Sequence, residues 1–227
     1  MTAMGGGLSF RATAITVLAF AMAMAYLEAG VVVYLQGALG AVVGDIFPLR
    51  PAIEAGNLVL IEVGREVATM VMIATIGAIA GRTGLERLAW AAVVFGAWDI
   101  GYYAWLRLFS GWPGSLATID LLFLIPVPWV GPVWSPLLVS SALLGFGLAA
   151  ATRLRAGRPV PVARREWMIA LVGGLLVILS YTLDSGRLFD GRMPGAYPWP
   201  VFAAGMLLAV SAAVAALRHP APPRPAR

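Results

Sequence analysis

The sequence predicts an all-α integral membrane bundle of six transmembrane helices, and two observations carry that prediction. Apolar residues make up 60% of the 227 residues, whereas only 12% are charged. Soluble domains are about 45–50% apolar and about 25% charged, so this chain has too little charge to cover a water-soluble globule. In addition, six apolar segments each have about the 20 residues that a helix needs to cross a bilayer.

Loops and turns rich in Gly, Pro and Arg separate the six segments. The segments are residues 12–36, 53–80, 85–108, 136–153, 167–184 and 199–217. With a cytoplasmic N-terminus, most Arg residues fall on the cytoplasmic side, and five lie in the stretch 153–165. The positive-inside rule therefore predicts that both termini are cytoplasmic. We divide the chain into helices 1–4 (1–152), a basic cytoplasmic linker (153–166), helices 5–6 (167–218) and a disordered tail (219–227).

The stretch 111–136 departs from this pattern of long apolar helices. It is rich in Pro and Trp, and within it the ten residues from Leu116 to Ile125 are mostly apolar. A helix of that length reaches only about 15 Å, which is too short to span. With Ser115 as N-cap and Pro126 as a stop, we expect a short re-entrant or interfacial helix on the outer side. Three residues of the stretch would form a lid: Trp112, Asp120 and Trp129.

The residue types that are missing exclude several classes of cofactor. The chain has no Cys and no Lys, and its single His is His219 in the tail. We therefore expect no haem, zinc or iron–sulfur cluster held by His or Cys, and no Schiff base on Lys. The net charge of +5 is explained by the topology signal and by contact with anionic lipid, so nucleic acid is not an expected partner. The bilayer is the expected partner, together with other membrane subunits or further copies of the chain.

Ionisable residues inside the apolar segments are the best candidates for a functional site. They are Glu28, Glu62, Arg65, Glu66 and Asp99. Each costs about 2.5–3.5 kcal/mol at a helix centre, so such residues usually face the bundle interior and a partner. At a rise of 1.5 Å per residue, the four acids lie near the midplane or within about 7 Å on its outer side. Tyr103 follows Asp99 by one helical turn and is included in the site.

Four acids beside one Arg leave an excess of negative charge that a dry interior does not hold. Either some of the acids are protonated or a cation is bound. The sequence therefore predicts a cation- or proton-binding site, with a divalent ion such as Mg²⁺, Ca²⁺ or Mn²⁺ as the metal that oxygen ligands suit. The structural alternative is that Arg65 pairs with Glu62 and Glu66 while Glu28 and Asp99 bond to Tyr, Trp or backbone. The cluster would then only join the helices.

Five motifs between about residue 20 and residue 140 carry a resemblance. They are Tyr26-Leu-Glu28, Glu62-Val-Gly-Arg-Glu66, Phe95-Gly-Ala-Trp-Asp99, Gly111-Trp-Pro113 and Asp120-Leu-Leu-Phe-Leu-Ile-Pro-Val-Pro-Trp129. With them the chain resembles an uncharacterised family of bacterial polytopic membrane proteins. The resemblance covers about half of the chain and implies a bacterial inner-membrane location, but no activity, substrate or cofactor.

The sequence leaves three functions open. The leading one is a transport or ion-handling protein whose intramembrane acids bind a cation or protons, with the 111–136 lid controlling access. The second is an accessory subunit of a larger membrane complex, in which the charges are structural. The third is an intramembrane enzyme in which an acid pair works on a lipid head group. The sequence assigns no catalytic residue for this third function.

Overall fold

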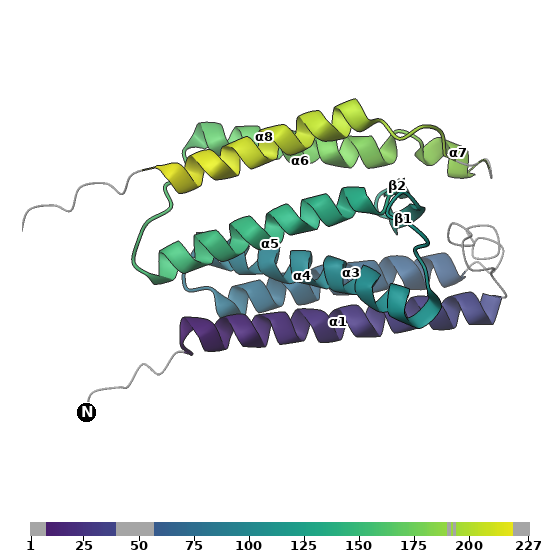
Figure 1. Cartoon of the computed structure of the whole chain (residues 1–227), viewed down its shortest axis with the longest axis horizontal. Coiled ribbons are helices and arrows are strands. Elements are labelled where there is room, and N and C mark those ends of the chain that lie inside the picture. Colours follow the sequence, from purple (N-terminus) through teal and green to yellow (C-terminus); the bar gives the residue numbers. More distant parts are fainter. Residues whose placement is uncertain (1–7, 40–56, 190–191, 193, 220–227) are drawn as a thin grey trace, which may run out of the picture.

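The chain folds into a bundle of long helices with a β-hairpin near one end, beside the beginning of α5, which spans Trp134–Arg155 (Figure 1). The computed structural model describes residues 8–39, 57–189, 192 and 194–219. Its long helices are α1 (Phe10–Leu39), α3 (Asn57–Ala80), α4 (Gly84–Ser110), α5 (Trp134–Arg155), α6 (Arg164–Thr182) and α8 (Trp199–Arg218). A short helix α7 (Ser185–Phe189) precedes α8.

The long helices lie roughly along one axis and alternate in direction, so α1 begins and α8 ends at the same end of the bundle (Figure 1). The β-hairpin lies at the opposite end, which we call the hairpin end. The other end is called the linker end, because residues 156–163 connect α5 to α6 there. The six predicted helices thus form close to their expected bounds. Residues 53–56 and all of the expected disordered tail except His219 lie outside the described residues.

Four of these helices are long and apolar enough to cross a membrane. They are Phe10–Leu35, Trp134–Arg155, Arg164–Leu188 and Trp199–Arg218. This is the composition of a membrane-embedded protein. Helices α3 and α4, which carry Glu62, Arg65, Glu66 and Asp99, are not among the four.

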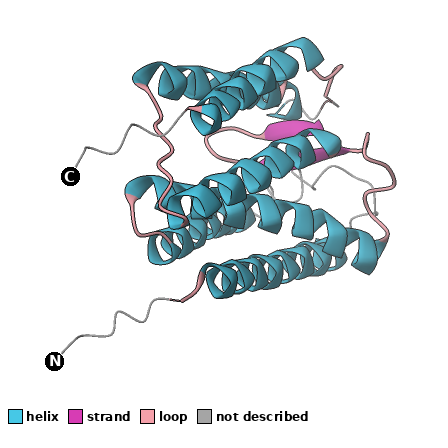
Figure 2. Cartoon of the chain, turned by 60° about the vertical axis from the view of Figure 1, so that its left-hand side comes forward, coloured by secondary structure: helices cyan, strands magenta, loops and turns pink. Residues whose placement is uncertain are grey.

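The prediction of a short helix over 116–125 is wrong, and the fold is therefore not all-α. Residues Ile119–Phe123 form strand β1, which pairs antiparallel with β2 (Trp129–Pro132). The two strands (magenta in Figure 2) lie beside the beginning of α5. A helix of only about ten residues is marginally stable on its own. Hydrogen bonds to a partner strand therefore stabilise the backbone of this segment more than hydrogen bonds within a short helix would. Pro126 and Pro128 lie in the connection between the strands, where no inter-strand hydrogen bond requires their N–H groups.

Helix α4 is the centre of the larger part of the bundle and packs against α1, α3 and α5. It begins at an N-cap, where the Thr83 hydroxyl accepts from the Glu86 N–H at 3.2 Å, and ends at Gly111, whose φ of 73° is left-handed. Gly96 lets α5 approach closely, because a Cβ there would collide with the Ser140 carbonyl.

Helices α6 and α8 form a second, smaller part of the molecule. They pack tightly on each other and contact the rest mainly through β2 and α5. A Cβ at Gly173 would lie 2.7 Å from both the Gly205 carbonyl oxygen and the Ala209 nitrogen, so only Gly permits this approach. The two parts have separate clusters of buried residues, one around Trp90 and one around Tyr181. The space between the two parts holds the site described below.

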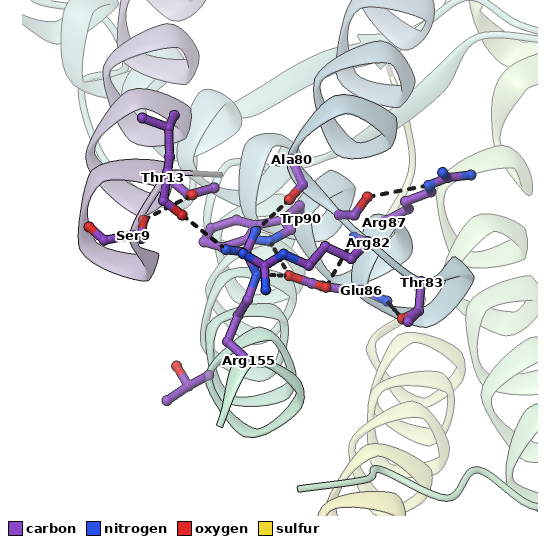
Figure 3. Close-up of polar contacts among 12 residues, drawn as sticks. Ser9, Thr13, Ala80, Arg82, Thr83, Glu86, Arg87, Trp90 and Arg155 are labelled. Atoms are coloured by element: carbon purple, nitrogen blue, oxygen red, sulfur yellow. Dashed lines mark hydrogen bonds and ion pairs between the residues drawn. The ribbon is translucent and has the colours of Figure 1, made fainter. Parts of the chain in front are cut away.

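A buried ion pair joins three helices at the linker end (Figure 3). The Arg155 guanidinium pairs with Glu86 and donates to the Ala80 carbonyl at 2.7 Å, so it ties the end of α5 to α3 and α4. Glu86 also accepts from the backbone N–H of Arg82 at 3.0 Å and from the Trp90 indole at 3.4 Å. The sequence identified Arg155 only as part of the basic topology signal. The structure gives this residue a packing role as well.

Candidate functional site

One large cavity lies between the two parts of the molecule. Its volume is about 1060 Å³, and it is bounded by α3, α4 and α5 on one side and by α6 and α8 on the other. Strand β1 and Trp129 of β2 contribute to its wall at the hairpin end. The nine residues that the sequence selected as site or lid all line it: Glu28, Glu62, Arg65, Glu66, Asp99, Tyr103, Trp112, Asp120 and Trp129.

Arg65 forms the centre of an ion-pair network at the hairpin end. Its guanidinium lies 2.6 Å from the Glu28 carboxyl of α1 and donates to Glu62, one turn earlier on α3, at 2.5 to 3.0 Å. These side chains retain 12–25% of their exposure, so the network borders the cavity. The structural alternative placed Glu66 beside Arg65. Glu28 occupies that place, because Glu66 is turned about 100° around the helix from Arg65.

Glu28 also connects α1 to the two neighbouring helices. Its second carboxyl oxygen accepts from the Trp98 indole N–H of α4 at 3.1 Å and from the Thr69 hydroxyl of α3 at 3.4 Å. The carboxyl therefore has donors on both oxygens, with Arg65 on the other one. A partly buried carboxyl held in this way fixes the relative position of α1, α3 and α4.

Glu66 of α3 holds the hairpin. Both of its carboxyl oxygens accept from the backbone N–H of Leu124, at 2.8 and 3.0 Å, just beyond the end of β1. The bulge in the hairpin register falls between Leu121 and Phe123, so the ladder is irregular here. The carboxyl group supplies an acceptor where the strand pairing ends.

Asp99 and Asp120 each bond to a hydroxyl group. Ser140 of α5 donates to Asp99 at 2.8 Å, and Tyr103 of α4 donates to Asp120 at 2.8 Å. Asp120 lies in β1, outside the helices, where burial raises the pKa of its carboxyl to about 7. The Tyr103 hydroxyl and the Leu121 N–H act in the opposite direction and limit this rise.

The acids expected to bind a divalent metal do not lie together in the described part of the chain. Within residues 8–39 and 57–219, leaving out those whose placement is not described, no three His, Asp or Glu side chains lie together as a metal site requires. Arg65 lies between Glu28 and Glu62, while Glu66 and Asp99 are directed to partners of their own. A divalent ion needs several carboxyl or carbonyl oxygens at 2.0–2.6 Å. The arrangement instead presents separate carboxyl groups around a roomy cavity.

Aromatic rings form a continuous row along the hairpin end of the cavity. Successive ring centroids lie 6.4 Å apart from Trp98 to Phe123, 5.5 Å from Phe123 to Trp129, and 6.1 Å from Trp129 to Tyr181. All four residues line the cavity. Of these four residues, only Trp129 was predicted from the sequence to belong to the site. Phe123 and Trp129 face each other across the hairpin. This aromatic pair can be predicted only if the segment is recognised as two strands.

Away from this end the cavity wall is almost entirely apolar. Ala and Leu side chains of α4, α5 and α8 predominate, together with Met70 and Ala74 of α3 and Gly174 of α6. The wall extends to Leu217 and Glu166 near the linker end, where Glu166 accepts from the Ala163 N–H at 2.5 Å and contacts His219. The cavity thus combines one charged, aromatic end with a long apolar remainder.

The chain was compared with protein-family models, curated proteins and solved structures, and none of them matches it.

Proposed function

We propose that the protein is a bacterial inner-membrane transport protein that takes a lipid-like amphiphile from the bilayer into this cavity. The apolar length receives the tail and the charged, aromatic end receives the head group. All six long helices cross the membrane in this proposal. The charges of α3 and α4 are tolerated because Glu66 and Asp99 are buried and Arg65 is paired within the bundle.

The observation that carries the proposal is the division of one cavity into a charged end and an apolar remainder. Its volume of about 1060 Å³ lies slightly above the range of about 300–1,000 Å³ that is usual for ligand sites. A cavity of this size suits a long molecule better than a bare ion. A site for an inorganic ion alone has no use for apolar walls that extend toward Leu217 at the linker end. An amphiphile uses both parts of the cavity.

The distribution of Arg supports one orientation in the membrane. The linker end carries Arg82 and Arg87 and the basic linker, so by the positive-inside rule we propose that it faces the cytoplasm. The charged end of the cavity then lies in the outer half of the bilayer. A head group bound there comes from, or leaves to, the outer leaflet.

Filling the apolar part of the cavity tests the proposal. Gly174 lines the cavity, and a Cβ there meets nothing within 4 Å, so Gly174→Phe places a ring into the space without a backbone collision. Gly145→Phe is the matched control, because Gly145 is exposed, has an equally open Cβ position and lies outside the cavity lining. We expect Gly174→Phe to lower the binding of radiolabelled long-chain amphiphiles to protein in nanodiscs, and their flux in proteoliposomes, at least five-fold. Equal binding by the two variants would contradict the proposal.

Proton transport is the second candidate, and a specific observation favours it. The hydrogen bonds that Glu66 and Asp99 accept come from a backbone N–H and a hydroxyl, which suit either protonation state of a carboxyl. In this case Asp99→Asn should abolish proton flux in proteoliposomes at unchanged folding, with Asp184→Asn as the control outside the cavity. Proton flux that persists without any amphiphile would favour this candidate over the first.

A further inference from the structure

We propose that the molecule in the cavity is an amphiphile whose head group carries a positively charged nitrogen, held at the hairpin end among Asp99, Asp120 and the aromatic row. This inference rests on the proposed function, because it names the chemical class of the amphiphile. It goes beyond that function in committing to the sign of the charge and to the groups that recognise it.

The balance of charge along the cavity wall is the first argument. Arg65 is the one basic residue among the described residues that line the cavity, and it is already shared by Glu28 and Glu62. The bonds that Asp99 and Asp120 receive from Ser140 and Tyr103 come from neutral groups. An anionic head group would bring a further negative charge beside these carboxyl groups. A cationic head group would instead offset their negative charge when they ionise.

The aromatic row is the second argument. The faces of Trp and Tyr rings attract ammonium groups that lie within about 6 Å of a ring centroid. Trp98, Phe123, Trp129 and Tyr181 follow one another at 5.5 to 6.4 Å along the wall that bears the carboxyl groups. Acidic groups beside aromatic faces are the combination that recognises quaternary and primary ammonium groups.

One hydrogen-bond donor in the same wall is the third argument. The Trp129 indole nitrogen is buried and makes no hydrogen bond within the described part of the chain. Trp129 also lines the cavity and belongs to the aromatic row. A buried donor without an acceptor is unfavourable, so this N–H group is suited to an acceptor that arrives with the ligand. An ester, ether or hydroxyl oxygen near the charged nitrogen would satisfy it.

Binding of amphiphiles that share one tail and differ in head group tests the inference. The probes are radiolabelled hexadecyltrimethylammonium, hexadecyl phosphate and hexadecanol, added to protein in nanodiscs of a nitrogen-free glycolipid so that no bilayer ammonium group competes. We expect the ammonium probe to bind at least ten-fold more tightly than the phosphate. The soluble ion tetramethylammonium lacks the tail and should bind at least a hundred-fold more weakly than the long-chain ammonium probe.

Conservative variants locate the recognition. In the pair of variants Asp99→Asn and Asp120→Asn, each amide oxygen still accepts the Ser140 or Tyr103 hydroxyl, so the hydrogen bonds are kept while the charge is lost. Combined in one chain, they should weaken the binding of the ammonium probe at least ten-fold and change the binding of hexadecanol by less than two-fold. Asp184→Asn, whose carboxyl lies outside this cavity, should change neither affinity. Size-exclusion profiles establish that each variant is folded.

Three outcomes would overturn the inference, and they are distinguishable. If the three probes bind equally and Gly174→Phe still weakens all of them, the cavity binds amphiphiles without selecting a cation, and only this inference fails. If the phosphate binds best, the charge assignment is wrong. If no probe binds, the proposed function fails together with the inference.

Discussion

The Glu66 carboxyl accepts the backbone N–H of Leu124 through both of its oxygens, at 2.8 and 3.0 Å. Glu66 lies on α3, is 3% exposed, and contacts a chain segment far along the sequence. The bond fastens the hairpin to the helix that also carries Arg65. The position of the hairpin over the charged end of the cavity therefore depends on a charged side chain that sequence reasoning had placed in an ion site.

Removing this acceptor should destabilise the hairpin end. Glu66→Ala leaves the buried Leu124 N–H without a partner, and we expect a loss of about 1–3 kcal/mol in the free energy of unfolding. Glu66→Gln keeps an acceptor oxygen and should lose less than half of that amount. Unfolding in mixed detergent micelles, followed by circular dichroism, measures both. Equal losses for the two variants would show that charge, and not the hydrogen bond, holds the strand.

The ion pair at the linker end should behave as a buried pair. The Arg155 and Glu86 side chains are 10% and 3% exposed. Arg155→Met leaves Glu86 buried without its cation and should cost about 3–5 kcal/mol. The double variant with Glu86→Gln should recover most of that loss, because it removes both charges and keeps an amide oxygen that can accept from the Arg82 N–H or the Trp90 indole. Arg158→Met, at an exposed position of the same linker, is the control and should be nearly neutral. A double variant as unstable as Arg155→Met would contradict this account.

The helices could be predicted because each is encoded locally. Apolar runs of suitable length, with breaks such as Gly81-Arg-Thr-Gly84, place α4 at 84–110 where 85–108 was expected. The hairpin could not be predicted in the same way. A short apolar run reads equally as a buried strand or a helix, and the choice depends on β2 and on Glu66, which lie elsewhere in the chain.

The charged residues of the site could be predicted because ionisable groups are costly in apolar helices. Their partners could not. The contact of Arg65 with Glu28 depends on how α1 lies against α3, and the sequence does not encode this packing locally. The Ser140 hydroxyl that bonds to Asp99 and the Trp98 indole that bonds to Glu28 follow from helix packing that only the folded chain brings about.

The contact between α6 and α8 should be sensitive to a single methyl group. Gly173→Ala places a Cβ 2.7 Å from backbone atoms of α8, and we expect a loss of about 1–3 kcal/mol in the free energy of unfolding. Gly174→Ala is the matched control one residue along, where a Cβ meets nothing within 4 Å. It should be neutral or slightly stabilising, because Ala favours the helix. Both variants are compared by thermal unfolding in the same detergent, and a neutral Gly173→Ala would contradict the tight packing.

Stability should fall as the pH rises through the range in which Asp120 titrates. Burial raises the pKa of this carboxyl from 3.8 to about 7 in the folded chain, so the folded state binds more protons than the unfolded state between these values. The contribution of Asp120 to stability is therefore fully present below about pH 4 and is lost as the pH rises through about 7. Asp120→Asn does not titrate, and its free energy of unfolding should exceed that of the wild type by more at pH 8 than at pH 4. Measurements of both proteins at these two pH values, with Asp184→Asn as the control, check the sign. A difference between Asp120→Asn and wild type that is constant with pH would show that the Asp120 carboxyl has the same pKa in the folded and unfolded chain.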